Sequence, residues 1–493
     1  MKRFSLLIGI MMLIVSPVRA ADDPVQKAMK AYEKHRYEDA LRDLRAALPS
    51  LEPARQASAH LTLGMIALKS AELHRGLARV SSAVTVDHLK RLAAYRGAGR
   101  SRYSDLYLGL ALLESGNAGA ASAPLEKFIA GGGDPKHAAI ARIALGEAAY
   151  QRGDRQKAQE LWGGVDASDP EVRIRSAAAG SRAGLTERDP APLCDGALAE
   201  AKRTGKQPSV AVVKSCLDVY GRSGAIDKGF DLLARADLRS YSYREAIGKS
   251  KVLSFYEPQL LSNLAAFYLQ ASIASLEKAA ADPQLKGVAS YYLGEAHLLA
   301  GNAEQAAKAL AAFLGAPQMP AAERSRALVR RGEIQYQKGK QADASGAWDD
   351  LNRSQPNDPE LLAEILFSCG RMRIDCPRAA QAAATAVETG EGKRFAVVNS
   401  GLGNYYLLKK DAAKAVTHLE TGRDKGNKNK IESNDPLMLV DLSDAYYRTK
   451  KYSEALEIYF EMSKQFPQVR QIQEALQGIY SMEHKSAGDV KIN

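Results

Sequence analysis

The chain has 493 residues and a formal net charge of +11, with 46% hydrophobic and 7% aromatic residues. Basic and acidic side chains are interspersed along it, which is typical of solvated helix surfaces, so we expect no nucleic-acid partner. Beyond the first twenty residues no segment is long and apolar enough to cross a membrane.

The N-terminus has the pattern of a secretory signal peptide. Lys2 and Arg3 precede an apolar stretch of 12 residues, 4–15, which is too short to span a bilayer. Small residues before the cut predict cleavage between Ala20 and Ala21. A retained anchor helix is the alternative interpretation.

The predicted signal peptide determines where we expect the mature chain to be located. Position 21 is Ala and not Cys, so no lipid anchor is expected there. Loss of the three basic residues Lys2, Arg3 and Arg19 lowers the net charge to +8. A bacterial signal of this type predicts a periplasmic protein, and association with the outer membrane through a partner stays open.

Two degraded helical units are expected within 23–83. Ala40 and Leu44 suit the second helix of the first unit. The second unit has Gly64 at its start, with Gly76 and Val80 at the positions where a second helix would make its contacts. A basic, Gly-containing connection is expected to follow over 88–102, and better-formed units begin near 103.

A pattern of small and large residues recurs through the rest of the chain. Each copy starts from a small reference residue, namely Gly109, Gly146, Gly294, Gly332, Gly403 and Ser443. Twelve residues later comes an alanine, namely Ala121, Ala158, Ala306, Ala344, Ala415 and Ala455. Sixteen residues later comes a large apolar residue, namely Leu125, Trp162, Leu310, Trp348, Leu419 and Tyr459. This pattern predicts stacked helical hairpins.

Each copy is predicted to be two antiparallel helices joined by a tight turn. Seven residues after the reference residue stands a helix breaker such as Gly116 or Gly339, or else Lys410 or Lys450. The next residue is often a helix N-cap, as at Asn117. A non-repeating helical bundle is the alternative, although a bundle does not need the same small residue at one offset.

The pattern resembles the tetratricopeptide repeat family. The resemblance is carried by Leu–Gly pairs such as Leu402–Gly403, by the alanines, by Tyr406 and Tyr446, and by Pro170, Pro356 and Pro467 at the ends of units. It implies an all-α fold, a right-handed α-solenoid of antiparallel helix hairpins with essentially no sheet. Each hairpin of such an array contacts only its neighbours.

The pattern also divides the chain into segments. They are the signal peptide 1–20, N-terminal repeats 21–190, an irregular region of helical hairpins 191–285, a regular array 286–467, and a capping helix with a mobile tail 468–493. Within the irregular region, 239–255 is a polar, Tyr-rich stretch. Within the regular array, the lysine-rich loop 422–436 is a candidate partner contact.

Four cysteines in an exported chain indicate disulfides. Helices predicted over 190–204 and 208–220 are joined by a turn that begins at Gly205. Cys194 and Cys216 each lie 11 residues from Gly205, so they stand opposite one another in an antiparallel hairpin.

Cys369 and Cys376 are a candidate second pair. A bridge requires that Gly370 end its helix early, because a helix that continued to the hairpin tip would hold the two sulfurs too far apart. Two buried thiols are the alternative.

The sequence contains no clear catalytic, metal or cofactor motif. Gly248-Lys249-Ser250 imitates the end of a phosphate-binding loop, but Tyr243 stands where that loop needs a glycine. Neither a Cys-x-x-Cys nor a helical His-x-x-x-His spacing occurs. We therefore expect a non-enzymatic protein without metal or cofactor. An enzyme with its site in the irregular middle region is the remaining alternative.

The resemblance implies a binding groove lined by the first helix of each hairpin. Its expected contacts lie one, four and five residues past the reference residue, where acids or amides and tyrosines recur. These positions are Glu147, Tyr150, Gln151, Glu295, Glu333, Tyr336, Gln337, Asn404, Asp444, Tyr447 and Arg448. An extended peptide or a helix that carries Lys or Arg would suit them. Simple packing of the tyrosines and solvation of the acids is the alternative.

The function expected from this resemblance is a scaffold in the bacterial cell envelope that binds another protein or peptide in its concave groove. The alternative is an accessory protein for polysaccharide or pilus export, which would bind glycan or the export machinery. The identity of the partner, the pathway and the oligomeric state stay open.

Overall fold

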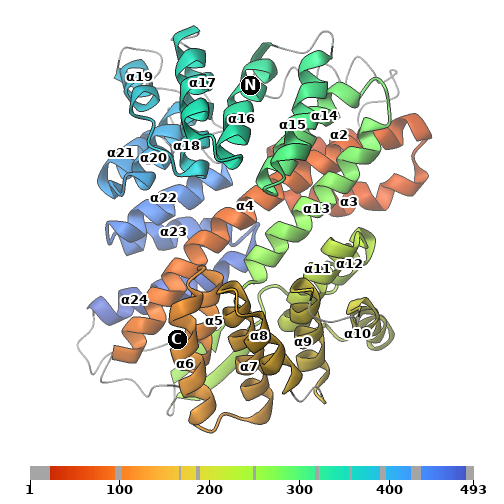
Figure 1. The fold of residues 1–493 in the computed structure, drawn as a ribbon, viewed down its shortest axis with the longest axis vertical. Coiled ribbons are helices and arrows are strands. Elements are labelled where there is room, and N and C mark those ends of the chain that lie inside the picture. The colour runs from red at the N-terminus through yellow and green to blue at the C-terminus, as the bar shows by residue number, and fades with distance from the viewer. Residues whose placement is uncertain are drawn as a thin grey trace. The chain divides into compact units, whose positions relative to one another are not determined.

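The structure is a computed structural model, and it describes residues 23–94, 101, 103–165, 168–184, 189–247, 251–316, 321–354, 358–388, 396–423 and 435–484. The predicted signal peptide with its cleavage position, the tail after 484 and most of the loop 422–436 lie outside these residues. The described chain is almost entirely helical (Figure 1). Within it, no helix combines the length and the apolar character needed to cross a bilayer.

The chain forms two compact units, and each is assembled from separate stretches of sequence. Unit 1 is the chain up to Leu73 together with Ala271–Lys451, and unit 2 is His74–Gln270 together with the chain from Tyr452 onward. Two of the three divisions fall inside long helices, α4 (Pro53–Ala94) and α13 (Leu260–Ala280), and the third lies between Lys451 and Tyr452. The predicted segments follow the order of the sequence, whereas the compact units do not.

Unit 1 contains the regular helical hairpins of the C-terminal half. Its helices besides parts of α4 and α13 are α2 (Pro24–Glu33), α3 (Tyr37–Ala47), η1 (Leu48–Ser50), α14 (Lys286–Leu299), α15 (Ala303–Gly315), α16 (Ala321–Gln337), α17 (Gln341–Ser354), α18 (Pro359–Met372), α19 (Pro377–Glu388), α20 (Ala396–Leu408), α21 (Ala412–Arg423) and α22 (Pro436–Arg448). Ala40 and Leu44 are buried on α3, as predicted for the second helix of the first unit.

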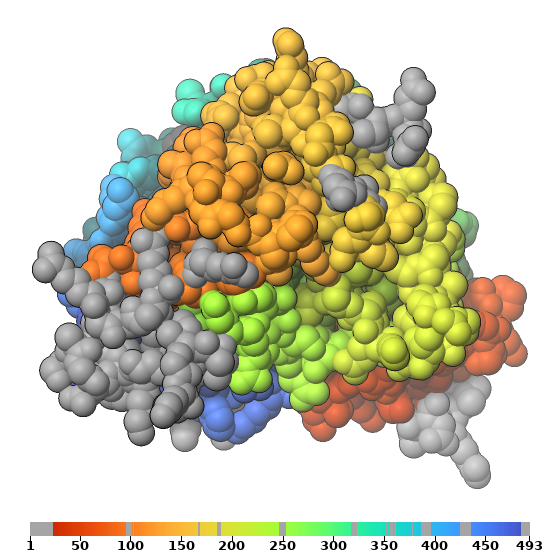
Figure 2. Space-filling model, turned by 90° about the horizontal axis from the view of Figure 1, so that it is seen from below, coloured from red at the N-terminus to blue at the C-terminus, as the bar shows by residue number. Residues whose placement is uncertain are grey.

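Unit 2 contains the remaining helices and a short β-hairpin. Its elements besides parts of α4 and α13 are α5 (Ser104–Glu114), α6 (Ala118–Ala130), α7 (Pro135–Gln151), α8 (Arg155–Gly163), α9 (Pro170–Arg182), α10 (Ala191–Thr204), α11 (Val210–Ser223), α12 (Ile226–Leu233), β1 (Tyr243–Ile247), β2 (Lys251–Phe255), α23 (Tyr452–Met462), η4 (Pro467–Val469) and α24 (Arg470–His484). Figure 2 shows side chains of α6 to α8, in orange, and of α9 to α12, in yellow, on one continuous face.

The recurring small residue lets the two helices of a hairpin touch. A Cβ added to Gly332 would overlap the ring of Trp348, and one added to Gly294 would overlap Leu310. Trp348 also donates its Nε1 hydrogen to the Val329 carbonyl at 2.9 Å, which ties the second helix to the first. The small and large positions of the pattern therefore face each other, and the predicted solenoid of antiparallel hairpins is confirmed.

The prediction that the second degraded unit forms a helical hairpin was wrong. Gly76 and Val80 do not lie on a second helix, because α4 runs without a turn from Pro53 to Ala94 and takes in much of the expected connection. In unit 1 the partner of Gly64 comes from α13 instead. A Cβ on Gly64 would lie 2.5 Å from Leu276 Cγ, and Ser272 donates to the Gly64 carbonyl at 2.8 Å across a sequence separation of 208.

Unit 2 uses the same contact between distant helices. A Cβ on Gly478 of α24 would overlap the ring of His88 on α4, and Gln471 donates to Ser81 at 2.6 Å. The last helix was expected to cap the array against solvent. It packs on α23, and it also contacts α4 through Gly478 and Gln471.

One short β-hairpin is the only sheet among the described residues. The strands pair antiparallel, with Tyr243 opposite Phe255. Phe255 stacks on Tyr107 of α5 at 4.2 Å between ring centroids, and Tyr243 packs on Tyr103 at 4.1 Å. Aromatic burial against α5 therefore holds the polar stretch in an extended form, since an isolated two-stranded hairpin is marginal in water.

Hairpin turns in unit 1 share one backbone conformation. The turn residue is left-handed in each, with φ of 79° at Gly339 and of 55°, 60° and 61° at Arg373, Lys410 and Lys450. The NH of Gly339 donates to the Tyr336 carbonyl at 2.8 Å, and that of Lys410 to the Leu407 carbonyl at 3.1 Å. A side chain in this conformation costs roughly 1 kcal/mol, which glycine avoids.

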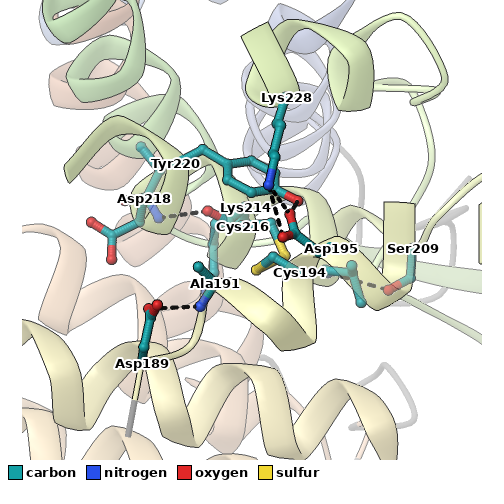
Figure 3. Close-up of a disulfide and its surroundings, with 12 residues drawn as sticks. Asp189, Ala191, Cys194, Asp195, Ser209, Lys214, Cys216, Asp218, Tyr220 and Lys228 are labelled. Atoms are coloured by element: carbon teal, nitrogen blue, oxygen red, sulfur yellow. Dashed lines mark hydrogen bonds and ion pairs between the residues drawn. A yellow bond between two sulfur atoms is a disulfide. The ribbon is translucent and has the colours of Figure 1, made fainter. Parts of the chain in front are cut away.

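Both cysteine pairs lie at bonding distance. Cys194 on α10 faces Cys216 on α11, with 5.4 Å between the Cα atoms (Figure 3). Beside them Asp195 accepts from the Tyr220 hydroxyl at 3.1 Å and pairs with Lys228 at 2.8 Å.

Cys369 and Cys376 are bridged with a Cα separation of 6.3 Å. The requirement that Gly370 end the helix was wrong, because α18 continues to Met372. The left-handed Arg373 then reverses the chain, and the NH of Ile374 donates to the Cys369 carbonyl at 2.9 Å. This reversal returns Cys376 to its partner.

Replacing Gly64 by Ala should destabilise the protein by about 1–3 kcal/mol, because the added methyl group meets Leu276. Gly119→Ala is the matched control: it also lies in a helix but has open space, so its melting temperature should stay equal or rise. Thermal denaturation followed by circular dichroism measures both. Equal effects of the two changes would contradict the pairing of α4 with α13.

Replacing Cys194 and Cys216 together by Ala should cost about 3 kcal/mol, since the bridge closes a loop with a sequence separation of 22. The same change at Cys369 and Cys376, with a separation of 7, should cost about 2 kcal/mol. Peptide mapping without reductant should recover each pair as one linked peptide. Recovery of free thiols at these positions would show the prediction to be wrong.

Candidate functional site

Five first helices of unit 1 lie side by side and form the candidate binding surface. In order they are α14, α16, α18, α20 and α22, and each contacts the next. We call them the first-helix row. They run in the same direction, because each hairpin reverses the chain twice. Residues at equivalent positions of successive hairpins therefore recur along the row.

The acids predicted for the groove are bound within the row. Glu295 of α14 accepts from Arg330 Nε of α16 at 2.5 Å, and Glu333 accepts from Arg330 Nη1 at 2.9 Å. Glu333 also accepts from Arg371 Nη2 of α18 at 2.5 Å. Glu364 of α18 binds Arg330 Nη2 at 2.8 Å. The four charges around Arg330 thus link three successive first helices.

This network is removed from solvent. Glu333 is 2% exposed and Arg330 is 4% exposed. Burial alone would raise the pKa of Glu333, but Arg371 and Arg330 outweigh it, and the Glu333 pKa lies below its usual range. Burial wins at Glu295, where Arg330 only partly opposes it and the pKa lies above the usual range. Glu333 is therefore a charged, occupied group and not an open contact for a partner.

The remaining predicted positions of the row also bind their own neighbours. Asn404 of α20 donates to Asp441 of α22 at 3.0 Å, and Gln337 donates to the Leu298 carbonyl of α14 at 3.1 Å. Asp444 accepts from Arg448 Nε at 2.8 Å and from Arg448 Nη2 at 2.9 Å within the same helix. Their polar groups therefore form hydrogen bonds between neighbouring first helices or within one of them.

Two tyrosines of the row, and the last residue of α16 and of α22, keep accessible surface. Tyr336 and Tyr447 are half-buried, as is Gln337, whereas Arg448 is exposed. A tyrosine at such a site offers an apolar ring edge and a hydroxyl at once. Glu295 and Asn404 are half-buried as well, so within unit 1 only Glu333 and Asp444 of the predicted set are buried.

The other three predicted residues lie on α7 in unit 2. Glu147 is partly buried and lies 3.5 Å from Arg182 of α9. Tyr150 packs against Trp162 of the same hairpin at 6.4 Å between ring centroids, and Gln151 is exposed. The partner-binding role of the whole predicted set stays a prediction.

The sequence analysis did not identify the arginines that bind the predicted acids. Arg330 stands three residues before Glu333, a spacing that brings side chains together on a helix, and this was a usable signal. Arg371 and Ser368 come from the next hairpin, and no local spacing points to them.

Unit 2 holds a second buried charge cluster in its irregular part. Glu257 is 1% exposed and lies 2.7 Å from both Arg175 and Lys214. Burial would raise the pKa of Glu257, but the two cations lower it to about 2. Ser242, just before β1, donates to the same carboxylate at 2.6 Å. The cluster joins α9 and α11 to the segment that carries the β-hairpin.

A cavity of about 310 Å³ lies in unit 2 between α4, α5, the β-hairpin and α24. Glu474 at its wall accepts from the hydroxyls of Tyr241 at 2.5 Å and Tyr256 at 3.2 Å. Burial raises the pKa of Glu114 to about 7, and Ser262 donates to this carboxyl at 3.1 Å. The carboxyl groups of the wall are bound to neighbouring hydroxyls. Among the described residues no three His, Cys, Asp or Glu side chains are grouped as a metal site requires.

Comparison with known proteins adds little to this geometry. No family description matches the chain, and no curated protein matches it. Among solved structures it aligns with a tetratricopeptide repeat protein from Parabacteroides merdae at 12% identity, over 70% of this chain and 100% of that one, with a TM-score of 0.27. Yeast Tom70 aligns at 14% identity over 93% and 94%, with a TM-score of 0.31. Such scores do not decide the fold, which the hairpin packing establishes directly.

Replacing Glu333 by Gln should destabilise unit 1 by about 3–5 kcal/mol, because Arg330 and Arg371 lose a buried counter-charge. The folded-state pKa of Glu333 is lowered, so its contribution is present at neutral pH and is lost as the pH falls through and below the ordinary range of a glutamate carboxyl. Thermal melts of both forms between neutral and acid pH measure this, and the stability gap should shrink toward acid pH. Glu304→Gln, on the exposed face of α15, is the control. A neutral effect of Glu333→Gln would contradict the network.

Proposed function

We propose that this chain is a non-enzymatic scaffold of the bacterial cell envelope that binds another protein or peptide along the first-helix row. The observation that carries the proposal is the buried network around Arg330, which locks successive first helices to one another. A surface whose helices are held in register loses little freedom when a partner binds, and this favours affinity.

The structure changes which side chains we expect to recognise the partner. Glu333 and Asp444 are almost fully buried and already bound by arginines, so they position helices. Tyr336 and Tyr447 keep accessible surface on the same helices and become the expected contacts. Tyrosine is enriched at interfaces because one side chain supplies apolar area and a hydrogen bond.

Two observations support export. The first twenty residues have the charge, apolar stretch and small residues of a signal peptide. All four cysteines are paired in two disulfides, and the side chains of all four are buried. Disulfides form and persist in oxidising compartments such as the bacterial periplasm. We propose the periplasm as the location of the mature chain.

A photoreactive amino acid at Tyr336 or at Tyr447 should crosslink one and the same envelope protein in living cells, because both positions keep accessible surface on the same row. Mass spectrometry identifies the product. The double replacement of Tyr336 and Tyr447 by Ala should then weaken binding of that protein about tenfold while leaving helicity unchanged.

The control for this experiment is the photoreactive group at Tyr480 on α24 of unit 2, which should give a different pattern of products. No product from either row position, or the same product from all three, would contradict the proposal. Binding of purified envelope glycan by the unmodified chain, lost in the double tyrosine variant, would favour the glycan-export alternative instead.

A further inference from the structure

The turns that end the first helices of unit 1 carry a concentration of positive charge. Four successive turns contribute Lys338, Lys340, Arg373, Lys409, Lys410, Lys450 and Lys451, all of them exposed. Two acids lie among them. Asp375 pairs with Lys409 at 2.5 Å, and Asp411 caps α21 through the NH of Lys414 at 3.1 Å. We call these four turns the basic edge.

The turns belong to one edge of unit 1. First helices that lie side by side and run in one direction end on the same side of the array. The bond from Lys409 to Asp375 joins the α20–α21 turn directly to the α18–α19 turn. The bond from Gln337 to the Leu298 carbonyl likewise joins the ends of α16 and α14.

Cations occupy this edge even where the backbone favours glycine. Gly301 and Gly339 take the left-handed turn position in two hairpins of unit 1, but Arg373, Lys410 and Lys450 take it in the next three. A long side chain at a left-handed position is unfavourable for folding. The charge is thus kept against the local preference of the chain, which indicates a role outside folding.

Much of this charge is not neutralised within the chain. Within the described residues, Lys338, Lys340, Arg373, Lys410 and Lys450 take part in no ion pair. In unit 2 the comparable turns differ. The α5–α6 turn, 115–117, carries no charge, and in the α7–α8 turn Arg152 is followed by Gly153 and Asp154.

We propose that the basic edge binds an anionic membrane surface and holds unit 1 on it peripherally. Each Lys or Arg brought close to an anionic lipid surface contributes favourable electrostatic energy, and several on one edge act together. The inference goes beyond the proposed protein-binding role, which uses the first-helix row and not the turns.

The chemistry of the edge favours a lipid surface over a polymer that binds in a groove. Lysine predominates, and its ammonium is a hydrated point charge on a flexible stem that needs no fixed geometry. Two tyrosine rings near the turns each have a lysine over them, Lys414 over Tyr406 at 5.3 Å and Lys451 over Tyr446 at 5.6 Å. The turn residues themselves, 338–340, 373–376, 409–411 and 449–451, include no aromatic side chain. The basic edge therefore consists of charge and not of rings on which a peptide or sugar chain would pack.

Vesicle binding tests the proposal with the purified full chain. Vesicles of phosphatidylcholine with about one third phosphatidylglycerol should bind the chain, and vesicles of phosphatidylcholine alone should not. Binding should fall steeply as salt rises, because salt screens exposed charges. The triple change Lys338→Glu, Lys410→Glu and Lys450→Glu should weaken partitioning roughly a hundredfold.

Two further variants keep the test decisive. Lys206→Glu, Lys278→Glu and Lys308→Glu together alter the net charge equally at exposed sites away from the edge, so this control should bind nearly as well as the unmodified chain. Arg373→Gly, Lys410→Gly and Lys450→Gly together remove three cations from left-handed positions, so this variant should melt no lower than the unmodified chain and yet bind weakly.

Three results would overturn the proposal. They are no binding to anionic vesicles, equal loss of binding in the control variant and in the edge variant, or binding to polyglutamate without binding to vesicles. Crosslinking from Tyr336 and Tyr447 is measured separately, so failure of the basic edge leaves the proposed protein-binding role standing.

Discussion

The close approach of two helices at a residue without a side chain is the contact on which both units depend. In the regular hairpins the large residue sixteen positions later packs against the glycine, as Trp348 packs against Gly332. Where no second helix follows directly, the same contact is made by a distant helix, as Gly64 receives Leu276 in unit 1 and Gly478 receives His88 in unit 2. One packing rule thus serves both local and distant pairs, since interiors tolerate neither voids nor overlaps.

Buried charge adds what the apolar contact lacks, namely a defined register between hairpins. Apolar side chains can slide past one another at small cost, but Arg330 must meet Glu295, Glu333 and Glu364 at the same time. A missing partner would leave a charge uncompensated in a dry interior, so displaced arrangements are strongly disfavoured. The buried charges therefore also fix the relative positions of the helices that form the surface of the first-helix row.

The sequence predicted the local part of this architecture and missed the distant part. Hairpins follow from offsets of twelve and sixteen residues, which a single helix pair imposes within its own length. Nothing near Gly64 reveals Leu276, and nothing in the polar stretch at 243–255 reveals the aromatic rings on α5 that hold it extended. The site shows the same division: the positions on the first helices were found, but their burial depends on Arg371 from another hairpin.

The passage of α4 and α13 through both units has a consequence for biosynthesis. No continuous stretch of the gene encodes a complete unit, because α4 is made early, its contact at Gly64 waits for Leu276, and its contact at His88 waits for Gly478 near the end of translation. Until the last helix is made, these faces stay without their partners. Long-range closure of this kind slows folding and leaves apolar faces open to wrong associations in the meantime.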